Sequence, residues 1–281
     1  MRSINKPDYD PKDVYLTCIS RVKNPVLKAR LESVADNVKT AAEVYDQNAI
    51  DGRLYTTLEH TNVAGIITKS EMEKVYTGRM AKVKVPGRPI YDRIKASAHH
   101  GICPFCGQRV VSQLDHYLPK AHFPVLSVVP FNLVPSCSDC NKSKLSDVPS
   151  SEEEQTFHPY YDDVTTEQWL YAEVIEDAVA TMRFFVSVPD DWGEVLQERA
   201  KTHFTTFGLG DLYVSQAGVE FSNIRSQLEK LFDKAGAEAV REHLNESAQS
   251  RYANHINSWQ TAMYQAMSDS GWFCNGGFLN I

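Results

Sequence analysis

The sequence contains no apolar run long enough to cross a bilayer. Its longest apolar stretch, residues 123–135, is shorter than the roughly 20 residues that a membrane helix needs, and three prolines interrupt it. The first 14 residues are polar and charged, without the apolar segment of a secretory signal. We therefore expect a cytoplasmic chain that has no membrane partner.

The sequence also lacks a nucleotide-binding loop of the G-x-x-x-x-G-K-[ST] type, so any use of ATP would have to come from a partner. It contains no internal repeat. Hydrophobic residues make up 42% and charged residues 23% of the 281 positions. These proportions are ordinary for a globular protein and exclude wholesale disorder.

Charge is distributed unevenly along the chain, whose net charge is −7. Residues 74–120 contain nine Lys or Arg and two Asp, whereas residues 151–281 contain eight Lys or Arg and 21 Asp or Glu. The first stretch suits a phosphate-binding surface, unless it is only a solvated loop. The second is unsuited to phosphate and suits either a partner protein or plain solvation.

Hydrophobic spacing predicts an α+β protein that is mainly helical. Asn24 before Pro25 is typical of a helix start, and apolar residues at helical spacing extend that helix to about residue 46. We divide the chain into a helical region (1–97), a compact metal module (98–150) and a mainly helical acidic region (151–281). Further helices are expected at residues 70–79, 88–98, 136–143, 195–207, 221–235 and 252–267, and strands at 169–175 and 181–188.

Four of the six cysteines form two C-x-x-C pairs, Cys103 with Cys106 and Cys137 with Cys140. In a reducing compartment such pairs are typical of metal ligands. Each turn presents two thiolates to one side, and two turns complete a tetrahedral zinc site without an open position. We therefore expect one structural Zn²⁺ held by these four residues.

Polar residues between and beside the cysteines suggest phosphodiester chemistry. Asp115 and His116 are adjacent, and Asn141 directly follows the last cysteine. A histidine can deprotonate water near neutral pH, and a carboxylate with an amide oxygen suits a hard cation such as Mg²⁺. We expect His116 in a solvent-accessible cleft. The candidate nucleic-acid contacts are Lys120, Lys142 and Lys144.

The pattern C-x-x-C, D-H-x-x-P, N-L-x-x-x-C-x-x-C-N-x-x-K resembles the zinc-containing HNH endonucleases, whose core is the ββα-metal finger. The resemblance implies that His116 is the general base and that Asp115 and Asn141 bind one divalent cation. It implies that Asn132 fixes the loop and orients the base. Asn141 stands where some relatives have His, which favours Mg²⁺ or Mn²⁺ over a softer metal.

Further segments resemble the HNH subunits of Septu-type anti-phage systems, including those attached to retrons. These are the stretch from Asp115 to Lys120, the stretch from Pro130 to Pro135, Arg88-Pro-Ile-Tyr-Asp92, and the C-terminal Trp272-Phe273 and Gly276-Gly277-Phe278. This resemblance implies an ABC-type ATPase partner, and for retrons a reverse transcriptase with its nucleic acid.

Two other functions stay open at this point. One is a zinc-ribbon module that binds nucleic acid or acts as an adaptor without catalysis, although such a module does not need Asp115, His116, Asn132 and Asn141 together. The other is a scaffold for an ATPase, which is compatible with a nuclease. His158 could approach the cation, but we expect a hydrogen-bonded loop histidine. The sequence does not distinguish a DNA substrate from an RNA substrate.

Overall fold

The computed structural model describes residues 1–144, 147–177 and 179–280. The chain divides into two compact units, which we name the N-terminal unit (Arg2–Asp162) and the C-terminal unit (Asp163 onward, with Met1). The N-terminal unit contains residues 2–97 and 98–150 together, and the division falls after residue 162 instead of after residue 150. Within these described ranges, the chain combines many helices with three small two-stranded sheets.

The helix that starts at Pro25 begins at a strong capping signal. The Asn24 side chain accepts a hydrogen bond from the backbone N–H of Leu27, and Pro25 occupies the first helical position, as predicted. The predicted single helix is interrupted at Val34, whose φ/ψ of −102°/8° is not helical. The helices of this part are α1 (Pro11–Ile19), α2 (Pro25–Ser33), α3 (Ala35–Ile50), α4 (Lys69–Tyr76) and α5 (Arg88–Ala96).

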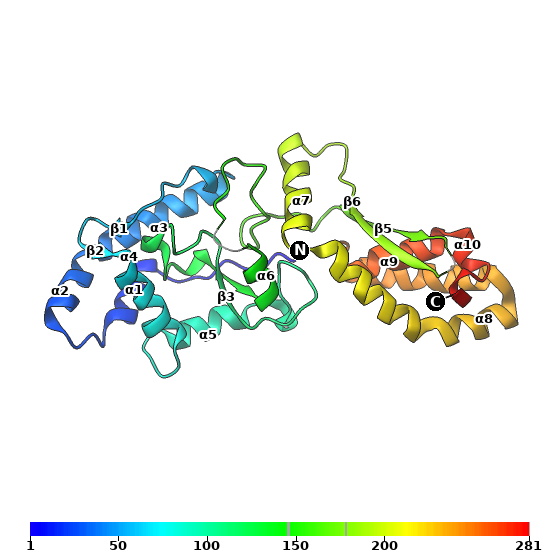
Figure 1. The fold of residues 1–281 in the computed structure, drawn as a ribbon, viewed down its shortest axis with the longest axis horizontal. Helices are drawn as coiled ribbons and strands as arrows, with labels where there is room; N and C mark the ends of the chain where they lie inside the picture. The colour runs from blue at the N-terminus through cyan, green and yellow to red at the C-terminus, as the bar shows by residue number, and fades with distance from the viewer. Residues whose placement is uncertain (145–146, 178, 281) are drawn as a thin grey trace. The chain divides into compact units, whose positions relative to one another are not determined.

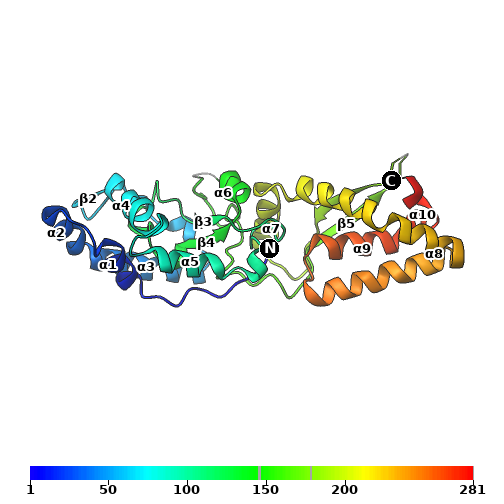
Figure 2. The same cartoon turned by 90° about the horizontal axis from the view of Figure 1, so that it is seen from below.

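A β-hairpin followed by a short helix forms the centre of the N-terminal unit (Figures 1 and 2). Strand β3 (Gln113–His116) pairs antiparallel with β4 (Leu133–Ser136), so that Asp115 lies opposite Val134. Helix α6 (Ser138–Lys144) follows β4 directly, and α5 packs against both strands. The remaining short elements are η1 (Leu54–Thr56), β1 (Asn62–Val63), β2 (Ile67–Thr68), η2 (Thr77–Ala81), η3 (His99–Gly101), η4 (Pro124–Leu126) and η5 (Pro130–Asn132).

The C-terminal unit packs a β-hairpin against helices. The two predicted strands are confirmed as β5 (Leu170–Ile175) and β6 (Thr181–Val186), which pair antiparallel and contact α9 and α8 respectively. Its helices are α7 (Glu194–Thr206), α8 (Leu209–Asn254), α9 (Trp259–Asp269) and α10 (Gly271–Cys274), with η6 (Gly277–Asn280) at the end.

Helix α8 is two antiparallel helical arms joined at Gly236, drawn in yellow and orange in Figures 1 and 2. Gly236 has φ 76° and ψ −170°, a conformation that residues other than glycine rarely adopt. The chain reverses there, because Gln227 on the first arm contacts His243 on the second at 3.1 Å. The predicted helix at residues 252–267 is wrong at its start. His255 is extended, and the Ser258 side chain caps α9 by accepting from Thr261 N–H.

Asn257 connects the loop before α9 to the chain entering β5. Its Oδ1 accepts hydrogen bonds from the backbone N–H of Trp169 (2.8 Å) and Leu170 (3.2 Å). Its Nδ2 donates to the carbonyl oxygens of Val164 (3.1 Å) and Glu167 (2.7 Å). Asn257 is 1% exposed, so its side chain satisfies four backbone groups away from water.

We expect Asn257→Ala to destabilise the C-terminal unit by at least about 4 kcal/mol, because each buried polar group left without a partner costs about 1–3 kcal/mol. Urea denaturation followed by circular dichroism measures the change. Asn275→Ala is the matched control, since Asn275 is exposed and caps only the end of α10. A similar small loss in both variants would contradict this role.

Among the described residues, no helix is both long and apolar enough to cross a membrane.

Candidate metal centre and candidate active site

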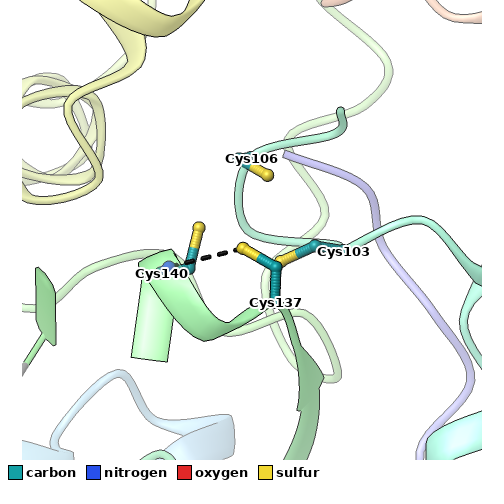
Figure 3. Close-up of side chains that lie close together, drawn as sticks. All are labelled: Cys103, Cys106, Cys137 and Cys140. Atoms are coloured by element: carbon teal, nitrogen blue, oxygen red, sulfur yellow. Dashed lines mark hydrogen bonds between the residues drawn. The ribbon is translucent and has the colours of Figure 1, made fainter. Parts of the chain in front are cut away.

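The four cysteines of the two C-x-x-C pairs converge on one point. The Sγ atoms of Cys103, Cys106, Cys137 and Cys140 all lie within 4.8 Å of one another, and all four residues are buried. Figure 3 shows the sulfurs gathered between the Cys103–Cys106 turn and the start of α6. Tetrahedral zinc bonded to sulfur at about 2.3 Å places sulfurs about 3.8 Å apart, so this cluster could hold Zn²⁺.

Backbone groups support both cysteine turns. Gly107, with φ 63°, closes the first turn and donates from its N–H to the Cys103 carbonyl oxygen at 2.8 Å. Backbone N–H groups also point at sulfur, from Arg109 to Cys106 (3.4 Å) and from Cys140 to Cys137 (3.3 Å). Hydrogen bonding among the four cysteines lowers the pKa values of Cys106 and Cys137 and raises those of Cys103 and Cys140. Donors to sulfur favour the thiolate form that binds metal.

We expect the wild-type chain to bind one zinc ion. We expect the Cys137→Ser variant to bind no zinc. Since binding energy in a closed thiolate site is largely folding energy, the unfolding midpoint should fall by about 10 °C or more. Elemental analysis and calorimetry measure the two quantities. Cys274→Ser is the control, because Cys274 is buried outside the cluster and its thiol donates to the backbone carbonyl oxygens of Met267 and Ser268. A well-folded wild-type chain without zinc would contradict the assignment.

Asp115 lies near the end of β3, at 5% exposure. Its Oδ2 atom is buried and has no hydrogen-bond partner among the described residues. The nearest cation is Lys144, whose Nζ is 3.4 Å from that oxygen. Burial raises the pKa of Asp115, and Lys144 opposes this shift. A buried carboxylate oxygen without a hydrogen-bond donor is suited to a metal ion.

Lys144 is not the surface residue that the sequence suggests. It is 6% exposed, and its Nζ donates to the backbone carbonyl oxygens of His116 (2.9 Å) and Tyr117 (2.5 Å). With its ion pair to Asp115, the ammonium group is fully engaged inside the protein. The prediction that Lys144 contacts phosphate is therefore wrong, because its ammonium group is paired with Asp115 and donates to backbone carbonyl oxygens at the end of β3.

His116 is also more enclosed than the cleft residue expected from the sequence, at 6% exposure. Its Nε2 lies 2.9 Å from the Ser127 carbonyl oxygen, and its ring meets that of Tyr76 edge-on at 4.4 Å between centroids. Burial lowers the pKa of His116 to about 3, and Lys120 acts in the same direction. The imidazole is thus neutral, with its proton on Nε2 because a carbonyl oxygen only accepts. Nδ1 carries the lone pair.

Asn132 holds the long connection between β3 and β4. Its Oδ1 accepts from the Leu118 N–H at 2.7 Å, and its Nδ2 donates to the carbonyl oxygens of Leu118 (3.0 Å) and Leu126 (3.4 Å). The Asn132 carbonyl oxygen accepts from the Tyr117 N–H at 2.8 Å. Because Ser127 follows Leu126, these bonds fix the carbonyl group that His116 contacts.

The other candidate residues lie around this centre. Asn141 is half-buried, and it lies one turn before Lys144 on α6, so the two share a face of the helix. Lys142 is exposed. Lys120 is half-buried, with its Nζ 5.7 Å from the centre of the Tyr76 ring.

His158 is a buried, hydrogen-bonded histidine. Its Nδ1 accepts from the Tyr160 N–H at 3.2 Å, and its Nε2 therefore donates to the Tyr45 hydroxyl at 2.9 Å. Both ring nitrogens are occupied by protein groups, which agrees with the structural role expected from the sequence.

Two contributors to the site carry no signal in the sequence. Ser127 acts through a backbone carbonyl, which any residue would supply. Tyr76 closes one side of His116 from the end of α4, 40 positions earlier, and only the packing of that helix reveals it.

The fold and the centre define a protein with two compact units, small β-hairpins and a buried cluster of four cysteines suited to zinc. Its sequence is 33% identical over 230 residues to protein Ea31 of Escherichia phage lambda, covering 77% of each chain. The chain belongs to the family of Ea31, a name that states no activity. No protein-family model matches the chain. No solved structure matches it either.

Proposed function

We propose that this chain is a metal-dependent endonuclease of the HNH type. The observation that carries the proposal is the pairing of a neutral His116 with the neighbouring Asp115 at the end of β3. His116 is oriented by the Ser127 carbonyl, and among the described residues Asp115 Oδ2 is buried without a hydrogen-bond partner, with Lys144 Nζ 3.4 Å away as its ion-pair partner. The order β3, β4, α6 and the position of Asn132 between the strands support a ββα-metal arrangement.

The residues present fit a hard divalent cation. Asp115 Oδ2 lacks a hydrogen-bond partner within the described parts of the chain, and Asn141 offers an amide oxygen on the α6 face that also presents Lys144. Both donors are oxygens, which Mg²⁺ and Mn²⁺ prefer. When bound, such an ion would neutralise charge on the leaving 3′-oxygen.

His116 would act as the general base. Its Nδ1 accepts a proton from water as the water oxygen attacks phosphorus and the bond to the 3′-oxygen breaks; solvent protonates the leaving oxygen. The Ser127 carbonyl keeps the proton on Nε2 and so leaves the Nδ1 lone pair available to accept a proton. Asn132 positions Ser127 and thus acts through His116, not on the substrate.

A second function is a zinc-binding nucleic-acid or adaptor module without catalysis. One observation favours it: Lys144 already neutralises Asp115, which a purely structural pair would also do. In that case the pair serves only to join α6 to β3, and neither Asp115 nor His116 is needed for a reaction.

The decisive variant is His116→Gln. Glutamine keeps a side-chain donor for the Ser127 carbonyl and most of the volume but provides no base, so cleavage should fall by roughly 10²–10⁴-fold. Asp115→Asn should also lose cleavage, and added Mg²⁺ should restore part of it, whereas no Mg²⁺ concentration should restore His116→Gln.

The measurement is Mg²⁺-dependent cleavage of plasmid DNA, single-stranded DNA and tRNA by the purified chain with its partner. His60→Gln is the control, since His60 is exposed and outside the motif. Circular dichroism and zinc content check the fold. Full cleavage by a folded His116→Gln protein would contradict the assigned role of His116 and would favour the zinc-binding module without catalysis.

We also propose that residues 151–281 dock an ABC-type ATPase of an anti-phage defence complex. Their excess of 13 acidic over basic residues opposes contact with phosphate and suits a basic protein surface. We expect the tagged chain to co-purify with an ATPase from its native host, an association weakened by salt. Recovery of the chain alone at low salt would contradict this partner.

A further inference from the structure

A run of positive charges precedes the candidate active site. Residues 74–96 contain seven Lys or Arg and one acidic residue. Four of these seven basic residues are exposed, and we name the four the basic face. None of the four forms an ion pair within the described residues. Four lysines earlier in the same unit, by contrast, are paired with carboxylates (Lys6, Lys12, Lys28 and Lys39). The basic face consists of Lys74, Lys82, Lys84 and Arg93.

The helices that carry the basic face are fastened to the strand that carries Asp115 and His116. The Tyr76 hydroxyl at the end of α4 donates to the Leu114 carbonyl oxygen at 3.3 Å. The Tyr91 hydroxyl on α5 accepts from the Leu114 N–H, also at 3.3 Å. Both backbone groups of one β3 residue are thus bonded to the two helices, and the next two residues are Asp115 and His116.

Hydrogen bonds join the two ends of the segment between α4 and α5, so that the segment forms a closed loop. The Gly87 N–H donates to the Arg79 carbonyl oxygen at 3.0 Å, and Arg88 Nη1 donates to the Ala81 carbonyl oxygen at 2.5 Å. A Cβ at Gly87 would lie 2.6 Å from Cys18 Sγ and 2.8 Å from the Arg79 oxygen, so only glycine fits this closure. Lys82 and Lys84 are therefore presented by a fixed loop.

Positive charge continues from the basic face to the candidate base. The Tyr76 ring contacts the His116 ring at 4.4 Å, and the same ring has Lys120 Nζ 5.7 Å from its centre. Tyr76 thus joins the helix of Lys74 to the surroundings of His116. Lys120 therefore adds a positive charge beside the ring that contacts His116.

We propose that the basic face binds the phosphate backbone of the nucleic acid that the site cleaves, a proposal that rests on the proposed function. Three lysines and one arginine, on two helices and a fixed loop, provide separate positive charges for successive phosphates, which position a strand without reading its bases. DNA and RNA share this chemistry. Each phosphate neutralised by a cation releases counterions, so binding should weaken steeply with salt.

The test compares two triple variants of the full chain that lose the same charge. One is Lys74→Gln, Lys82→Gln and Arg93→Gln. Lys84 is kept because its φ of 62° makes a substitution there ambiguous. The control is Lys201→Gln, Lys230→Gln and Lys234→Gln, three exposed residues of the C-terminal unit. Thermal unfolding confirms that both variants fold.

The readout is fluorescence anisotropy of a labelled 30-base-pair DNA duplex, its single strand and the matching RNA duplex, without added Mg²⁺, over a salt series. On the preferred probe, the basic-face variant should lower the slope of log affinity against log salt by about 3, since each duplex contact contributes about 0.9. The control should leave the slope unchanged, and the RNA and DNA arms identify the preferred nucleic acid.

Equal slopes for the two triple variants would overturn the proposal. So would displacement of the probe by polyglutamate as effectively as by unlabelled nucleic acid, which would indicate an acidic protein partner. Binding without Mg²⁺-dependent cleavage in the wild type would reject the proposed function and leave the basic face standing. Equal cleavage by both variants at 0.15 M salt would reject the basic face and leave the nuclease standing.

Discussion

The ammonium group of Lys144 is the point on which the candidate active site depends. A buried charge is costly unless it is paired and hydrogen-bonded. Lys144 meets this need with the carbonyl oxygens of His116 and Tyr117 and with the Asp115 carboxylate. If the cluster holds zinc, the metal links the start of α6, at Cys140, to the turn that contains Cys103 and Cys106. Helix α6 is then fixed at both ends, and Asn141 lies between them.

A single buried side chain also holds the connection between β3 and β4. One buried amide, that of Asn132, satisfies backbone groups of Leu118 and Leu126. This holds the Ser127 carbonyl opposite His116 Nε2 and so fixes the imidazole tautomer. Burial keeps the imidazole neutral, so that the proposed general base holds a free lone pair before it accepts a proton. The Tyr76 and Tyr91 hydroxyls then join β3 to the helices of the basic face.

Much of this arrangement could be predicted from local sequence signals. Asn24-Pro25 predicted the start of α2 because a helix cap depends on neighbouring residues. Each C-x-x-C turn is equally local, and the cysteine cluster could be predicted because two such turns complete one zinc site. Longer-range features could not be predicted this way. Lys144 has the sequence context of a surface lysine at a helix end, and only the approach of β3 buries it. The return of α8 at Gly236 likewise depends on a backbone conformation that glycine permits but does not require.

The central claim is that Asp115 and Asn141 form a cation site separate from the cysteine cluster. Anomalous diffraction from crystals soaked in Mn²⁺, recorded at the zinc and manganese edges, tests it most directly. The account predicts one zinc peak among the four sulfurs and one manganese peak at Asp115 Oδ2, with Lys144 displaced from that oxygen. A zinc peak alone, with Lys144 still paired to Asp115 in saturating Mn²⁺ and bound nucleic acid, would contradict it.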